Sequence, residues 1–175
     1  MLIVIDVEAT CTNTNQFPRD EMEIIEIGAV LCHQQSYHPL SSFQAFVRPV
    51  RHPLLTVFCT ELTSIQQQDV DSASLFPEVM TCLSEWLRSH QAKQVTFCSW
   101  GAFDQKILRN NCKHHKVTYP FQTHINLKTE FARKQKSPTM GMASALRRIG
   151  LPLEGTHHRG IDDARNIAAL LPFCL

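Results

Sequence analysis

The chain of 175 residues has no long apolar run and no closely paired cysteines. Its apolar stretches are far shorter than the roughly 20 residues of a transmembrane helix, so we expect no membrane association. Residues 1–10 lack a basic segment and carry acids, which argues against a secretory signal. The seven cysteines form no Cys-x-x-Cys pair. An odd, irregularly spaced set without an export signal predicts reduced thiols and a cytoplasmic location.

The chain also has almost no excess of one charge over the other, since its net charge is only +1. Acids are nevertheless rare between residues 104 and 148, where Asp104 and Glu130 are the only ones. The basic residues of this stretch are Lys106, Arg109, Lys113, Lys116, Lys128, Arg133, Lys134, Lys136, Arg147 and Arg148. Such a basic half would suit a polyanion held beside bound cations, although solvated helix faces would have the same composition.

The sequence has no repeat, low-complexity tract or linker, and its length suits a single domain over residues 1–175. Early apolar, β-branched runs with short links predict an antiparallel meander of strands over 2–7, 24–32 and 42–48. Apolar residues at helical spacing predict later helices over 76–87, 103–111, 142–149 and 161–171. Short strands are expected over 95–98 and 125–127, the second leading into a further helix. The pattern indicates an α/β fold.

Two carboxylates one residue apart, Asp6 and Glu8, lie at the end of the first expected strand. Residues i and i+2 of a strand point to the same face, and burying two carboxylates side by side is costly. A hard divalent cation between them would offset that cost, because such cations bind carboxylate oxygens. The alternative is a strand that runs into solvent at Asp6, with Glu8 on a loop.

Further acids open two of the expected helices. Asp104 follows a strand and begins a helix, at the sheet edge where ligands of open α/β folds tend to bind. Asp162 and Asp163 begin the last helix, where one could cap it while the other points elsewhere. A neutral histidine on the preceding loop, which carries His157 and His158, is a candidate general base for a water. Ordinary helix-start acids and surface histidines would give the same pattern.

The order Asp6-x-Glu8, Asp104, His158-x4-Asp163 resembles the DEDDh 3′→5′ exonucleases. The stretches that further resemble the Eri-type (KapD-like) exoribonuclease branch are residues 6–11, 23–30, 46–49, 58–65 and 98–101. The resemblance as a whole covers nearly the whole chain. The resemblance implies an RNase H-like fold, with a mixed five-stranded sheet and helices on both faces.

The resemblance also implies roles for individual residues. It implies that two divalent ions, Mg²⁺ or Mn²⁺, are bound by Asp6, Glu8, Asp104 and Asp163. The family spacing makes His158, rather than His157, the general base. The positions that match those holding the terminal nucleotide are Ala9, Thr10 and Leu62. Trp100 and Phe103 lie beside these motifs and are expected to line the site.

The implied activity is hydrolysis of the terminal phosphodiester of single-stranded nucleic acid with a free 3′ end, releasing 5′-mononucleotides by a two-metal-ion mechanism. The Eri-type resemblance favours RNA. One alternative is a DNA-directed 3′→5′ exonuclease, and another is a catalytically weak nucleic-acid-binding module on the same fold. Members of this branch often carry an accessory nucleic-acid-binding domain, for which 175 residues leave no room. We therefore expect either that a protein partner supplies RNA specificity or that the enzyme is a small, less selective trimmer.

A metal-dependent phosphatase or a structural zinc protein is a further alternative, since histidine and cysteine are plentiful. However, Cys112-Lys113-His114-His115 has no matching second pair at zinc-finger spacing.

Overall fold

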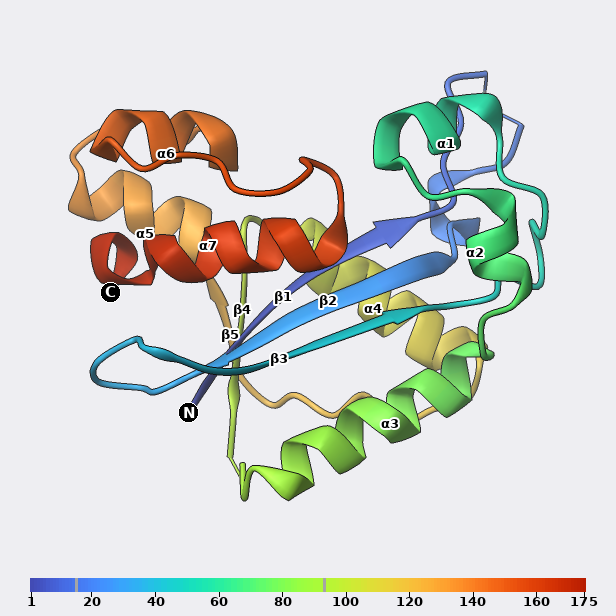
Figure 1. Ribbon diagram of the computed structural model, residues 1–175, viewed down its shortest axis with the longest axis horizontal. Coiled ribbons are helices and arrows are strands. Elements are labelled where there is room, and N and C mark those ends of the chain that lie inside the picture. The colour runs from blue at the N-terminus through green and yellow to red at the C-terminus, as the bar shows by residue number, and fades with distance from the viewer. Residues whose placement is uncertain (15, 93) are drawn as a thin grey trace.

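A five-stranded mixed sheet forms the centre of the computed structural model, which describes residues 1–14, 16–92 and 94–175 (Figure 1). The strands are β1 (Leu2–Ala9), β2 (Ile24–Cys32), β3 (Pro39–Phe46), β4 (Thr96–Ser99) and β5 (His124–Asn126). Their order in the sheet is β3-β2-β1-β4-β5. The first three strands pair antiparallel, whereas β4 pairs parallel with β1 and β5 parallel with β4. The predicted meander and the mixed five-stranded sheet are confirmed.

Helices cover both faces of this sheet, as predicted (Figure 1). They are α1 (Val57–Thr63), α2 (Gln67–Asp71), α3 (Phe76–Ser89), α4 (Phe103–His114), α5 (Leu127–Lys134), α6 (Met142–Ile149) and α7 (Gly160–Cys174), with a short 3₁₀ helix, η1, over Arg19–Glu21. In the described part of the chain, no helix has both the length and the apolar character that a membrane span requires.

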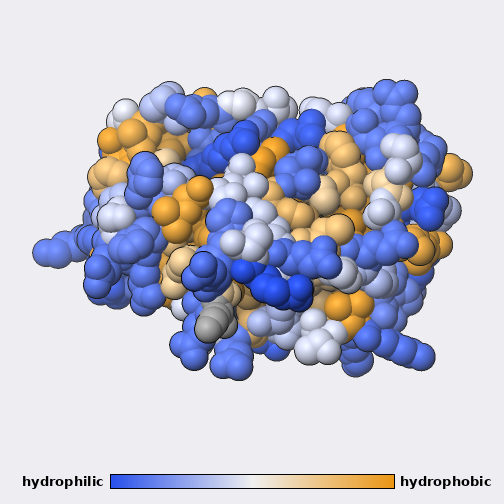
Figure 2. Space-filling view, turned by 60° about the horizontal axis from the view of Figure 1, so that its bottom comes forward, coloured by the Kyte–Doolittle hydropathy of each residue, from blue (hydrophilic) through white to orange (hydrophobic). Residues whose placement is uncertain are grey.

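The core therefore consists of two apolar layers, one on each face. Alternate residues of β1, such as Ile3 and Ile5, pack towards α3 and α4. Leu2 and Val4 point the other way, towards α5, α6 and α7. Every residue of β2 is buried, because helices cover both sides of it. Figure 2 shows mainly hydrophilic side chains on the side of α3, with smaller apolar areas between them.

The sequence pattern predicts no element over residues 57–71, where the structure has α1 and α2. These helices are too short to show a helical repeat in the sequence, and local capping defines them instead. The Thr56 side chain accepts a hydrogen bond from the Cys59 amide at the start of α1. The backbone amide of Gln66 donates a hydrogen bond to the side chain of Asp69 at the start of α2.

Candidate active site

Three carboxylates meet where β1 ends and α7 begins. Asp6 and Glu8 project from the same face of β1, and Asp163 lies in the first turn of α7. One carboxylate oxygen from each lies within 4.8 Å of the others. Glu8 and Asp163 are 9% and 4% exposed, whereas Asp6 keeps partial contact with solvent. The two-residue spacing noted in the sequence thus becomes a buried carboxylate cluster with one side open.

Asp104, in the first turn of α4, flanks this cluster. It is 5% exposed, and its Oδ1 accepts a hydrogen bond of 3.2 Å from the amide of Val7. Since Val7 lies between the two acids of β1, this bond fixes Asp104 beside them. The structure therefore brings all four predicted acids to one end of the sheet.

Burial makes ionisation of Asp6, Glu8 and Asp104 unfavourable. It raises the pKa of Asp6 well above the ordinary value, and the nearby carboxylates of Asp104 and Glu8 raise it further. Burial, followed by the surrounding carboxylates, raises the pKa of Glu8 to about 9. Burial also raises the pKa of Asp104 to about 6, although the hydrogen bond from Val7 opposes the rise. A cluster of buried carboxylate oxygens that is short of positive charge is a donor set that fits hard divalent cations.

Two glycines allow α7 to approach the sheet closely enough to deliver Asp163. Gly28 pairs with Asp6 across the β1–β2 ladder. A Cβ on Gly28 would lie only 2.1 Å from the carbonyl carbon of Gly160, and a Cβ on Gly160 would lie 3.1 Å from the carbonyl oxygen of Asp6. The first turn of α7 thus rests on bare backbone, and any side chain at residue 28 would displace it.

Glu26 holds the same turn in place through hydrogen bonds, and the sequence pattern predicts no individual role for this residue. It lies opposite Glu8 in the ladder and is fully buried. Its Oε2 accepts hydrogen bonds from the amide of Gly160 at 3.0 Å and from Nε of Arg159 at 3.1 Å. Its Oε1 accepts a bond of 3.1 Å from the Gln44 amide. The available signal was an acid inside the otherwise apolar run of β2, similar to the position of Asp6 in β1.

Both candidate histidines contact Asp163. Nδ1 of His157 lies 2.9 Å from Oδ2 of Asp163, and the His157 side chain is 42% exposed. The backbone amide of His158 donates to the same oxygen at 3.0 Å. The two imidazoles stack with their ring centres 4.0 Å apart. Burial, assisted by His157, lowers the pKa of His158, although Asp163 opposes this shift. His158 is thereby favoured in the neutral form that accepts a proton.

The residues expected to hold the terminal nucleotide differ in exposure. Ala9 and Thr10 are buried at the end of β1. The Thr10 hydroxyl accepts a hydrogen bond of 2.9 Å from the Glu23 amide, so this side chain ties β1 to β2. Any contact of these two residues with a ligand therefore falls mainly to their backbone. Leu62, on α1, is 37% exposed and offers an apolar side chain.

The two aromatic residues after β4 also differ. Phe103 immediately precedes Asp104 and is 50% exposed. Trp100 is half-buried, packs against Phe131 and donates from Nε1 to the carbonyl of Met140 at 3.0 Å. Phe103 thus presents an exposed ring at the start of α4, whereas Trp100 anchors the loop after β4 to the segment before α6.

This fold, with acids from β1, α4 and α7 at one end of its sheet, is that of an exonuclease. The RNase_T exonuclease family model matches residues 3–171, and the chain belongs to this family. The predicted membership of the DEDDh exonucleases is confirmed, and the family implies divalent metal ions at the site.

Curated relatives are similar over 97% of the chain. ERI1 exoribonuclease 2 of Mus musculus is 30% identical, and the chain spans 28% of its length. The 3'-5' exonuclease Snipper of Drosophila melanogaster is 32% identical, with 67% of its length matched. The 3'-5' exoribonuclease 1 of Rattus norvegicus is 33% identical, with 51% matched. The chain thus spans from about a quarter to two thirds of the length of these relatives.

Solved structures give the same family. The nuclease domain of 3'hExo, a DEDDh family member bound to rAMP, superposes with a TM-score of 0.90 at 31% identity, covering 97% of this chain and 88% of that one. Cell-death related nuclease 4 superposes with a TM-score of 0.88 at 26% identity, covering 97% and 62% respectively. A 3'-exonuclease in 3'-end specific recognition of a histone mRNA stem-loop has a TM-score of 0.90 at 29% identity, covering 97% and 78%.

Proposed function

We propose that the protein is a metal-dependent 3′→5′ exonuclease that removes 5′-mononucleotides from the free 3′ end of single-stranded nucleic acid, RNA in preference to DNA. The observation that carries this proposal is the buried cluster of Asp6, Glu8 and Asp163, with Asp104 beside it. The preference for RNA is supported by relatives named exoribonucleases, and by neighbours bound to rAMP or recognising an mRNA stem-loop.

The carboxylates of Asp6, Glu8, Asp104 and Asp163 would hold two divalent cations, Mg²⁺ or Mn²⁺, for which oxygen ligands are suited. Such ions stabilise the negative charge that develops on the attacking and leaving oxygens during phosphodiester hydrolysis. The depth of the cluster matters here, because charge–charge interactions are stronger where water is excluded. The partly exposed Asp6 marks the side from which a phosphate approaches.

His158 is the general base in this proposal, with one imidazole nitrogen accepting a proton from the attacking water. Its lowered pKa keeps the ring neutral, and the hydrogen bond from its amide to Asp163 fixes the loop next to the acids. His157 positions Asp163 through its Nδ1 contact.

The terminal nucleotide would lie between α1 and the start of α4. Leu62 and Phe103 supply exposed apolar surface against which a base can stack or wedge. The backbone of Ala9 and Thr10 borders the same space, and Trp100 supports its far wall. Discrimination between RNA and DNA would depend on contacts with the 2′-hydroxyl of this nucleotide.

Metal dependence tests the centre directly. End-labelled single-stranded RNA and DNA are incubated side by side with the protein in EDTA, Mg²⁺ or Mn²⁺. We expect no hydrolysis in EDTA, restoration by either ion, and faster degradation of RNA. Asp6→Ala should lower turnover by orders of magnitude while the fold persists, whereas Asp20→Ala, which removes an exposed acid of η1, should have no effect. Full activity in EDTA would contradict the proposal, and binding without hydrolysis under every metal condition would favour a binding module.

Polarity is tested with the ends of the substrate. A 3′-phosphate should slow the reaction strongly, and the products of an unblocked strand should be 5′-mononucleotides from the first time points onward. Rapid cleavage of a circular single strand would show endonuclease action and contradict the proposed direction.

A further inference from the structure

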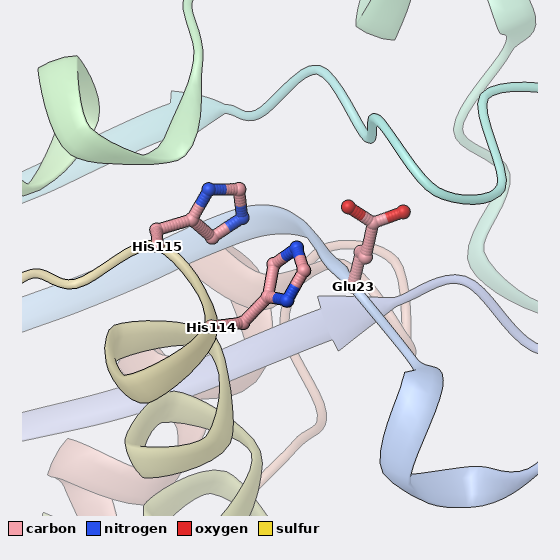
Figure 3. Close-up of side chains that lie close together, drawn as sticks. All are labelled: Glu23, His114 and His115. Atoms are coloured by element: carbon pink, nitrogen blue, oxygen red, sulfur yellow. The ribbon is translucent and has the colours of Figure 1, made fainter.

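A second group of metal-ligating side chains lies outside the exonuclease centre. It consists of Glu23, immediately before β2, and His114 and His115, at the end of α4. One ligand atom from each lies within 4.8 Å of the other two. Figure 3 shows a nitrogen of each imidazole and one oxygen of Glu23 directed into the same space. Glu23 is far from the two histidines in the sequence, so the sequence alone shows only the histidine pair.

The Glu23 carboxylate is held rigidly in place. It is 1% exposed, and its Oε1 accepts a hydrogen bond of 2.9 Å from the amide of Val50. Its Oε2 accepts from the amides of Arg51 at 2.7 Å and His52 at 2.9 Å. A carboxylate can accept about four hydrogen bonds, so one position on Oε1 remains available. This oxygen is fixed before any ligand arrives, which lowers the entropic cost of binding.

The two imidazoles are placed by packing, and their nitrogens remain free. The His115 ring stacks on Phe76, with the ring centres 5.1 Å apart, and meets the edge of His114 at 4.8 Å. Within the described residues, neither imidazole makes a side-chain hydrogen bond. His114 is exposed, so the space between the three ligands is open to ions from solvent.

We propose that Glu23, His114 and His115 bind a single transition-metal ion, with Zn²⁺ the best match to the ligands. Two imidazole nitrogens and one carboxylate oxygen form a three-ligand zinc set that leaves the fourth position to water. Imidazole suits zinc, copper and nickel, whereas the all-oxygen cluster at the exonuclease centre suits magnesium and manganese. The two sites therefore select different ions.

Binding requires only a small adjustment. Tetrahedral zinc ligands at bond lengths of about 2.1 Å lie roughly 3.4 Å from one another, so the exposed His114 ring must turn slightly inward. Besides the neighbouring His114, the positive charge of Arg51 reaches His115, and Arg51 opposes a bound cation. We therefore expect one ion of moderate affinity.

The ion would join three segments that are far apart in the sequence: the start of β2, the end of α4 and the turn at residues 50–52. It would not touch the reacting atoms, because its ligands are distinct from the acids and histidines of the exonuclease centre. Zinc should therefore stabilise the fold without being required for hydrolysis.

The experiment uses the full chain, stripped with a chelator and returned to excess Mg²⁺. A His157→Ala/His158→Ala background is used for binding, because those histidines form another metal-ligating group with Asp163. Zn²⁺ is titrated by calorimetry, Co²⁺ by visible absorption, and the melting temperature is measured with and without Zn²⁺. We expect one Zn²⁺ per chain, a tetrahedral Co²⁺ spectrum and a higher melting temperature with zinc.

Adding His114→Ala/His115→Ala to this background should weaken zinc binding at least about tenfold, or by about 1.4 kcal/mol, and abolish the rise in melting temperature. The exposed His38 lies outside the cluster, so His38→Ala should change neither readout. His114→Ala alone changes only an exposed side chain, and it replaces the double variant if that one fails to fold. Zinc binding unaffected by either His114 variant, or absent from the parent, would overturn the proposal. In the otherwise native chain, His114→Ala should leave hydrolysis with Mg²⁺ unchanged.

Discussion

Glu8 illustrates at the scale of one residue why the exonuclease centre needs cations. Its carboxylate lies in a buried strand, with other carboxylates as its nearest charged neighbours. Ionising it therefore costs free energy, and only a nearby positive charge can offset that cost by stabilising the carboxylate. Replacing Asp6 or Glu8 by a neutral residue should accordingly stabilise the metal-free protein while abolishing its chemistry, which is the reverse of the effect expected for an acid in a salt bridge.

The pH dependence of stability follows from the same shift. The pKa of Glu8 rises from 4.5 to about 9 on folding, so between these values the folded chain keeps a proton that the unfolded chain has released. This group therefore contributes a stability that falls as pH rises through that window. In EDTA, the melting temperature of the native chain should decrease, relative to that of Glu8→Gln, from about pH 5 to about pH 8. Mg²⁺ or Mn²⁺ should remove much of the difference, and a relative increase with pH would contradict the assignment.

The two adjacent histidines allow a paired test of the proposed base. A general base contributes about 10²–10⁴-fold to turnover. His158→Ala should lose about that much in single-turnover hydrolysis with saturating Mg²⁺, while metal-dependent substrate binding persists. His157→Ala should lose far less. If His157→Ala were the inactive variant, the base would be His157 and the family assignment would stand.

At the scale of elements, the contact between α7 and β2 decides whether the site forms. A Cβ on residue 28 would lie 2.1 Å from backbone atoms of Gly160, so Gly28→Ala must push α7 away from the sheet. We expect a loss of about 1–3 kcal/mol in unfolding free energy and about 100-fold in turnover from misplacement of Asp163. Denaturant unfolding and single-turnover hydrolysis measure the two effects.

Gly141→Ala is the matched control for that substitution, because a Cβ at residue 141 would meet nothing within 4 Å. It should leave turnover unchanged and alter stability only slightly. Equal effects of the two substitutions would show that the close approach of α7 does not limit the site.

The sequence predicted those features that depend on short spacing. Asp6 and Glu8 are two residues apart, so the strand period alone places them on one face, and the apolar repeats located the longer helices. It did not predict α1 and α2, which are defined by caps rather than by a repeat. Nor did it predict the roles of Gly28 and Glu26. Their importance comes from Gly160, which is 134 residues beyond Glu26 and reaches it only through tertiary packing.

At the scale of the whole molecule, charge is distributed unevenly around a nearly neutral total. The exposed basic residues between 104 and 148 lie on α4, α5, α6 and the segments that join them. They offer a long strand many possible phosphate contacts beyond the terminal nucleotide, and such contacts weaken as salt rises because counterions are released on binding.

The effect of salt on the KM of a long and of a short substrate tests this distribution of charge. The KM for a long single-stranded RNA should rise steeply with salt, whereas the KM for a dinucleotide should change little, since a dinucleotide reaches only the centre. Hydrolysis rates of both substrates at several salt concentrations provide the measurement. Parallel salt dependence of the two substrates would show that the basic stretch does not hold the strand.

The packing of α7 also has a consequence for synthesis of the protein. Asp6 is synthesised early, but Asp163 and the Gly160 amide that donates to Glu26 are synthesised only after every strand of the sheet. The nascent polypeptide therefore contains the sheet long before it contains a complete set of acids. The centre is complete only once α7 has been synthesised and has packed on the sheet, so a chain that stops before α7 should contain the sheet without exonuclease activity.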